Sequence, residues 1–79
     1  MTIKTRTRVL SAETRTSRKS GNSYMLLNFM DGAQVVNAMV DNEAIPMAQQ
    51  ITPFNEYELV IDFNFRYGSA RVTHIKAVQ

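Results

Sequence analysis

The strongest structural pattern in the chain is Tyr57-Glu58-Leu59-Val60-Ile61-Asp62-Phe63-Asn64-Phe65-Arg66-Tyr67. Its odd positions are all apolar or aromatic, whereas most of its even positions are charged or polar. Successive side chains of a β-strand point to opposite faces, so this alternation predicts a half-buried strand. We expect its core side to carry Tyr57, Leu59, Ile61 and Phe63.

Weaker patterns predict four further strands, at residues 3–9, 24–30, 34–40 and 70–78. The pair Asp31-Gly32 suits a tight turn and predicts that the strands on either side of it form a hairpin. The last strand should return antiparallel after Gly68-Ser69. Residues 41–53 contain two prolines and allow at most a short helical turn.

Five short strands with a longer connection between the third and the fourth predict an all-β, five-stranded antiparallel Greek-key barrel of the OB type, although an open sheet or a small sandwich has the same periodicity. The whole chain, residues 1–79, should form one domain. A domain of this size has a marginal core of its own, which favours a homodimer.

The basic residues are concentrated at one end of the chain. Residues 1–20 carry six basic and one acidic side chain, whereas residues 21–79 carry three basic and six acidic ones. The stretch 14–22, called here the basic stretch, has no apolar residue, interrupts the first strand's pattern and is expected to form a mobile, protruding basic β-wing. A local positive field of this kind favours polyanions, although a solvated basic tail would have the same composition.

Residue content argues against several other classes of protein. Without cysteine, disulfides and zinc fingers are excluded, and a reducing cytoplasm is the expected location. No apolar run is long enough for a membrane span. His74 is the single histidine, the acids lie along strands, and the glycines are isolated at turns, so we expect no enzyme, no cofactor and no metal site.

Aromatic residues beside the basic ones suggest contact with unpaired bases. Tyr24 directly follows the basic stretch, where its ring could stack on a base or pack in the core. Phe65 and Tyr67 lie on either side of Arg66 in the sequence, close to Gly68-Ser69 and Arg71, where base stacking and dimer packing are equally compatible. In the strand 24–30 both faces are apolar, so one should face the core and the other a partner subunit or bases.

The segment Lys19-Ser20-Gly21-Asn22-Ser23-Tyr24-Met25-Leu26 resembles a motif of the gene V type single-stranded DNA-binding proteins of filamentous bacteriophages. The resemblance implies an OB-like dimer that coats single-stranded phage DNA cooperatively during replication in the host cytoplasm. It also implies phosphate contacts by Arg15 and Lys19, stacking by Tyr24 and Phe29, an apolar contact by Leu26, and a dimer-forming hairpin at residues 65–71. His74 stands where the family pattern has an arginine.

Together these considerations predict sequence-tolerant binding of single-stranded DNA, or of RNA. The predicted contact residues are Arg6, Arg8, Arg15, Arg18, Lys19, Tyr24, Leu26, Phe29, Phe65, Arg66, Tyr67 and Arg71. Two alternatives stay open: an RNA-binding OB domain that represses translation, and an assembly subunit that binds another protein.

Overall fold

The computed structural model describes residues 1–64, 66 and 68–78. Along the chain it contains β1 (Thr2–Thr16), β2 (Ser23–Asp31), β3 (Gln34–Val40), the short 3-10 helix η1 (Asn42–Ala44), α1 (Ile45–Ala48), β4 (Glu56–Asn64) and β5 (Ser69–Ala77). The predicted strands, the hairpin after Asp31 and the short helical connection are therefore confirmed, except that β4 ends at Asn64 and Arg66 lies in a turn.

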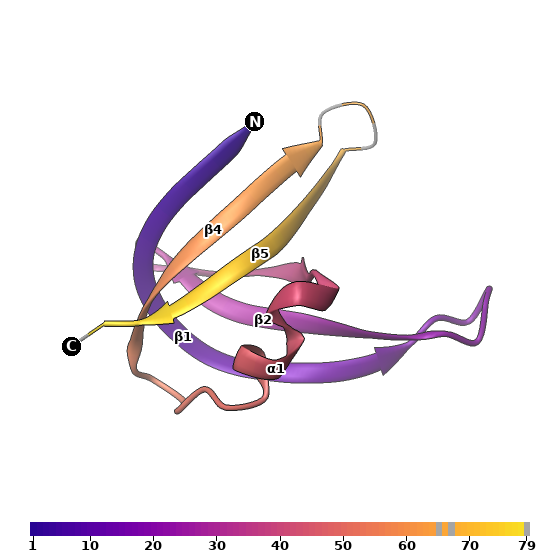
Figure 1. The fold of residues 1–79 in the computed structure, drawn as a ribbon, viewed down its shortest axis with the longest axis horizontal. Helices are drawn as coiled ribbons and strands as arrows, with labels where there is room; N and C mark the ends of the chain where they lie inside the picture. Colours follow the sequence, from indigo (N-terminus) through magenta and orange to yellow (C-terminus); the bar gives the residue numbers. More distant parts are fainter. Residues whose placement is uncertain (65, 67, 79) are drawn as a thin grey trace.

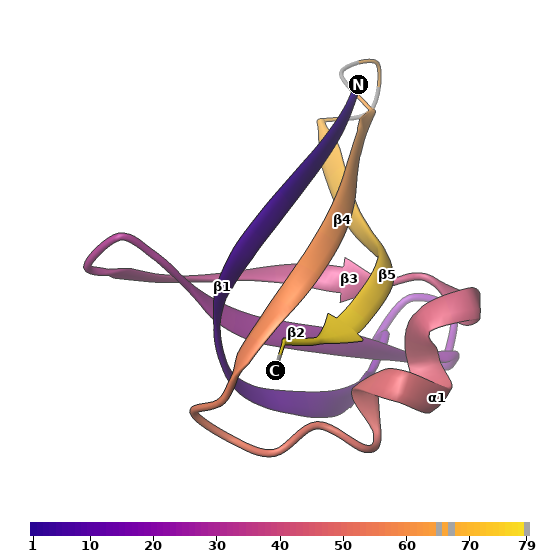
Figure 2. The same ribbon diagram turned by 60° about the vertical axis from the view of Figure 1, so that its left-hand side comes forward.

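In the described part of the chain the strands form a closed barrel in the order β1-β2-β3-β5-β4, with β4 returning to β1 (Figures 1 and 2). The expected all-β, OB-like barrel is confirmed. One detail is corrected, because β3 and β5 pair in parallel. Strand directions can alternate all the way around a ring only if the number of strands is even, so a closed ring of five must contain a parallel pair.

The centre of the barrel is filled from four strands. The largest fully buried side chains of the described residues are Val9, Leu27, Leu59 and Val72, each 0% exposed. Burial of one such side chain stabilises the fold by about 1.5–3 kcal/mol. The predicted core side of β4 is confirmed, since Tyr57, Leu59 and Ile61 are buried and Phe63 packs against the same cluster.

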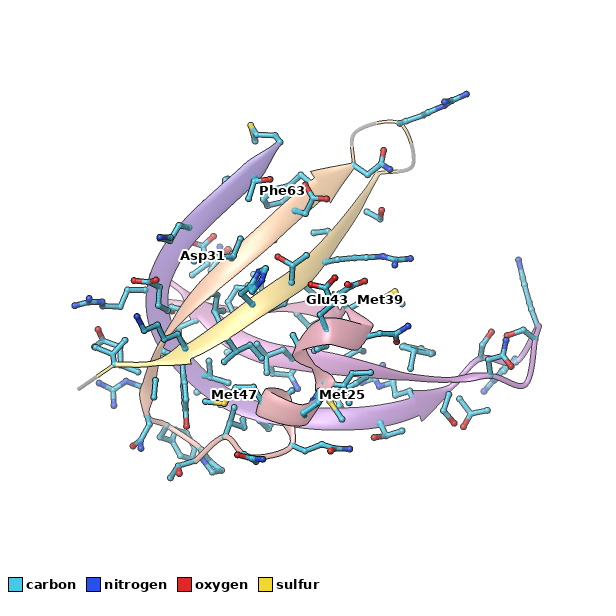
Figure 3. The ribbon with its side chains drawn as sticks, in the orientation of Figure 1. Met25, Asp31, Met39, Glu43, Met47 and Phe63 are labelled. Atoms are coloured by element: carbon cyan, nitrogen blue, oxygen red, sulfur yellow. The ribbon has the colours of Figure 1, made fainter. Side chains whose placement is uncertain are left out.

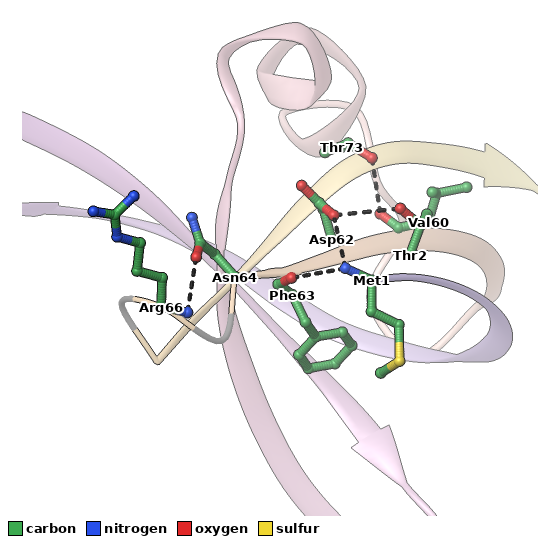
Figure 4. A network of polar contacts seen from close by, with 8 residues as sticks. All are labelled: Met1, Thr2, Val60, Asp62, Phe63, Asn64, Arg66 and Thr73. Carbon is green, nitrogen blue, oxygen red and sulfur yellow. Dashed lines mark hydrogen bonds and ion pairs between the residues drawn. The ribbon is translucent and has the colours of Figure 1, made fainter.

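The seam between β1 and β4 closes the barrel at the start of the chain (Figure 4). The Met1 ammonium donates to the Phe63 carbonyl at 3.0 Å, and the Phe63 amide donates back to the Met1 carbonyl at 2.7 Å. Thr2 donates its hydroxyl to the Asp62 carboxylate at 3.3 Å. Backbone pairing thus continues to the first residue of the chain.

A β-bulge at Leu10 allows β1 to run well beyond the predicted strand 3–9. Val9 lies opposite Phe29, but Ser11 lies opposite Asn28, so the core-facing positions change from odd before the bulge to even after it. The prediction that the basic stretch interrupts the strand is wrong for residues 14–16, because they pair with the first residues of β2.

The helical connection between β3 and β4 adds to the core. Ala44 and Ala48 are 3% and 1% exposed and belong to the buried cluster. The side chain of Met25 lies beside α1 (Figure 3). Among the described residues, no helix has the length and apolar character needed to cross a membrane.

Candidate nucleic-acid interface

The outer side of the β1–β2 hairpin carries three cross-strand pairs, Arg15 with Tyr24, Glu13 with Leu26, and Ser11 with Asn28. We call these six side chains the hairpin face. The intervening residues Met25, Leu27 and Phe29 belong to the core, so Tyr24 and Leu26 are directed outward. Tyr24 is half-buried, and it lies directly opposite the exposed Arg15 on the neighbouring strand.

Strands β3 and β5 extend this surface sideways. Met39 lies opposite Leu26 on β3 and in register with Arg71 on β5. Leu26 is buried, at 9% exposed, whereas Met39 is 36% exposed, so Met39 carries the apolar surface that is open to solvent here. The Arg71 guanidinium, at the far side of this surface, donates to the Asp41 carboxylate at 3.4 Å.

The tip of the hairpin, residues 17–22, projects away from the barrel (Figure 1). Its turn is defined by backbone hydrogen bonds from Ser17 to Asn22 and from Gly21 to Ser17, each 2.9 Å long. Gly21 has a φ of 74°, which glycine adopts without steric cost. Arg18 and Lys19 are exposed at this tip and form no ion pair with any described residue.

A hollow of about 490 Å³ lies where the hairpin leaves the barrel. It is lined by the side chains of Tyr24 and Met39 and by the polar side chains of Ser17, Ser20, Asn22 and Ser23. A flat ring and a thioether offer a stacking surface for a base, and the hydroxyl groups can donate to phosphate oxygens.

Glu13 places a negative charge in the middle of the hairpin face. Its carboxylate accepts hydrogen bonds from Arg15 at 3.0 Å and from Asn28 at 3.2 Å. The pKa of Glu13 is lowered below its ordinary value. The main cause is the hydrogen bond from Asn28, followed by the charge and the hydrogen bond of Arg15. Glu13 is therefore ionised at neutral pH, and its carboxylate holds the Arg15 guanidinium in an ion pair.

Two predicted contact residues, Arg6 and Arg8, lie on a different part of β1, where it pairs with β4. Arg8 and Arg15 are seven residues apart, which corresponds to about 23 Å along a strand. Arg6 lies 3.9 Å from the Glu56 carboxylate, and Arg8 donates to the Phe54 carbonyl at 3.0 Å. The structure thus does not bring these two arginines together with Tyr24.

The acidic residues of β4 serve as ion-pair partners for β1. Besides the pair of Arg6 and Glu56, Lys4 lies 3.8 Å from Glu58. His74 is exposed on β5, beside the Thr73 hydroxyl. Within residues 1–64, 66 and 68–78, no three His, Asp or Glu side chains are grouped so that they could hold a metal ion.

The expected stacking role of Phe29 is a misprediction. Phe29 is 6% exposed and packs in the barrel core, so its ring could reach a base only if the barrel opened. Phe65 and Tyr67, also expected to stack, lie outside the described residues. Arg66, between them, is exposed, and its amide donates to the Asn64 side chain at 3.0 Å.

Met39 and Glu13 belong to this surface but were not among the predicted contacts. Met39 could have been found from the alternation in residues 34–40, because Ala38 and Val40 face the core and Met39 must then face outward. No sequence signal identifies Glu13, since its position depends on the bulge at Leu10.

No protein family and no curated protein matches this chain.

Proposed function

We propose that this protein binds single-stranded DNA without sequence preference, through the hairpin face, the hairpin tip and Met39. The observation that carries the proposal is the outward position of Tyr24, opposite Arg15 and at the base of a tip with two cations that form no ion pair with any described residue. Cations that follow a phosphate backbone, together with a ring that stacks on bases, are the recurring elements of single-strand binding. The resemblance of residues 19–26 to the gene V type proteins supports the same function.

The proposed division of labour explains why unpaired strands should be preferred. Arg18 and Lys19 attract phosphates of any sequence, whereas Tyr24 requires the exposed face of a base. In a duplex the base faces are stacked on one another and cannot reach such a ring. The coating of single-stranded phage DNA during replication, in the cytoplasm of a host, would be the biological setting.

A homodimer is also part of the proposal. Val35, on the outer side of β3, is an apolar side chain that is 60% exposed in the single chain. Exposed apolar groups of this kind are commonly covered by a partner. Light scattering of the purified protein should then give twice the mass of one chain.

The salt dependence of binding tests the proposed function. With about four phosphates contacted per chain, the logarithm of the affinity for poly(dT) should fall against the logarithm of salt concentration with a slope near −3, at roughly 0.7 per phosphate. Anisotropy of a labelled oligonucleotide measured at several salt concentrations provides the slope. Equal affinity for duplex DNA, or an affinity independent of salt, would refute the proposal, and competition with matched RNA decides between the two nucleic acids.

Substitution of Glu13 by glutamine should tighten binding, because it releases Arg15 for a phosphate. One additional phosphate contact corresponds to about 5-fold at 0.1 M salt and a slope steeper by about 0.7. Because folding lowers the pKa of Glu13, its ionised carboxylate stabilises the folded state. This contribution to folding stability is complete above the unfolded-state pKa and is lost as the pH falls through the folded-state pKa. The effect on binding should therefore be constant between about pH 6 and 8.

The control for this substitution is Glu43→Gln, which removes the same charge from an exposed position on η1. We expect it to change the slope little. If both variants tighten binding equally, the effect comes from net charge, and Glu13 does not restrain Arg15.

A further inference from the structure

The ring of Phe54 is held in solvent by an unusual backbone. Phe54 lies between α1 and β4 and is 63% exposed. Its φ of 71° makes it the one described residue other than glycine in the left-handed region. Bulky side chains rarely adopt this conformation, because Cβ approaches the neighbouring carbonyl group.

Hydrogen bonds to β1 hold this conformation in place. The Phe54 amide donates to the Val9 carbonyl at 2.8 Å, and the Val9 amide donates to the Asn55 carbonyl at 3.0 Å. Val9 is fully buried next to the bulge, so the loop is attached to one of the most constrained points of the barrel. The Phe54 ring is thus presented from a rigid base.

Neither the strained backbone nor the exposed ring is compensated by packing. An exposed aromatic ring forgoes the burial that stabilises core rings, and left-handed backbone at a bulky residue has its own cost. Strain that is maintained by its surroundings occurs preferentially at binding sites. This combination indicates that the ring is presented to a ligand.

The surroundings of the ring indicate what the ligand is. The Arg8 guanidinium donates to the Phe54 carbonyl at 3.0 Å. Arg6 follows on the same outward side of β1, 3.9 Å from the Glu56 carboxylate. A rigid loop with an exposed ring, bonded through its backbone to one guanidinium and followed along β1 by a second, fits an unpaired base with its flanking phosphates.

We propose that Phe54 is a base-stacking ring of a second nucleotide subsite, in which Arg8 and Arg6 contact the phosphates. This inference rests on the proposed single-strand binding and extends it along the molecule. The outward side of β1 leads from Arg8 past Ser11 to Arg15, about 23 Å along the strand. One DNA strand following β1 would contact both subsites, which accounts for the two arginines that lie far from Tyr24.

The experiment measures the affinity for a 16-nucleotide dT oligomer and the thermal midpoint of three variants. Phe54→Asn and Phe54→Gly both remove the ring, and both asparagine and glycine tolerate a positive φ. Both should bind about 5-fold to 150-fold more weakly, the range for loss of one stacked base, while their thermal midpoint does not fall. Phe54→Tyr keeps the ring and should bind as the unmodified protein does.

Three results would overturn the inference. The first is unchanged affinity of Phe54→Asn and Phe54→Gly, with the unmodified protein binding the oligomer. The second is a lower thermal midpoint in both variants, which would assign the ring a structural role. The third is a change in self-association without DNA, which would assign the ring to a contact between chains. Absence of binding by the unmodified protein would instead refute the proposed function itself.

Discussion

Replacement of both Arg18 and Lys19 by glutamine should weaken binding to poly(dT) about 25-fold at 0.1 M salt. Both side chains are exposed at the hairpin tip and pair with no described acid, so they are available to phosphates. Two contacts at roughly 0.7 each make the slope against salt shallower by about 1.4, and this difference produces the loss of affinity at 0.1 M. Anisotropy titrations at four salt concentrations measure both quantities.

The matched control for this double substitution is Lys4→Gln combined with Lys76→Gln. It removes the same charge from exposed positions on β1 and β5, away from the hairpin tip. We expect less than half the change in slope. An equal loss of affinity in the two double variants would show that net charge alone attracts the DNA, and that the tip does not contact phosphates.

Substitution of Tyr24 by alanine should weaken binding by about 1–3 kcal/mol, or about 5-fold to 150-fold, at every salt concentration. The reason is the loss of a stacked ring without the loss of a cation, so the slope should stay unchanged. Because Tyr24 lies on the hairpin face and outside the buried cluster, the barrel should remain folded.

Two measurements test whether the weaker binding of Tyr24→Ala comes from loss of the ring or from loss of folding. Tyr24→Phe keeps the ring and should bind almost as well as the unmodified protein. Thermal unfolding of Tyr24→Ala should remain cooperative with a similar midpoint. If Tyr24→Ala loses its cooperative transition, Tyr24 supports the fold, and its assignment as a stacking residue is wrong.

Much of the barrel could be predicted because its core side obeys a strict period of two. In β4 each inward position from Tyr57 to Phe63 is apolar, and charged residues dominate the other side. The turn at Gly32, with a φ of 61°, has a comparably local cause. Such features depend on neighbouring residues only, so sequence pattern is sufficient to find them.

The candidate site was less predictable because it depends on contacts distant in sequence. On β2 both faces are apolar, so alternation separates Tyr24 from Phe29 but does not say which ring faces outward. The resemblance assigned stacking to both rings, although an odd spacing of five residues places them on opposite faces. Phe54 lies in a segment without periodicity, and its left-handed backbone is maintained by β1.

The bulge at Leu10 shows which changes in chain length the first strand would tolerate. Leu10 is the extra residue of the bulge, so its removal would place Ser11 opposite Asn28 directly after Val9 opposite Phe29 and would keep the faces of β1 as they are. Removal of one residue between Ser11 and Thr14 would instead exchange the two faces of everything that follows in β1, so that Arg15 would turn inward. An added residue among positions 17–22 would only lengthen an exposed turn. Insertions and deletions in related chains should therefore collect at the tip of the hairpin and avoid residues 11–14, a pattern that an alignment of such chains would reveal.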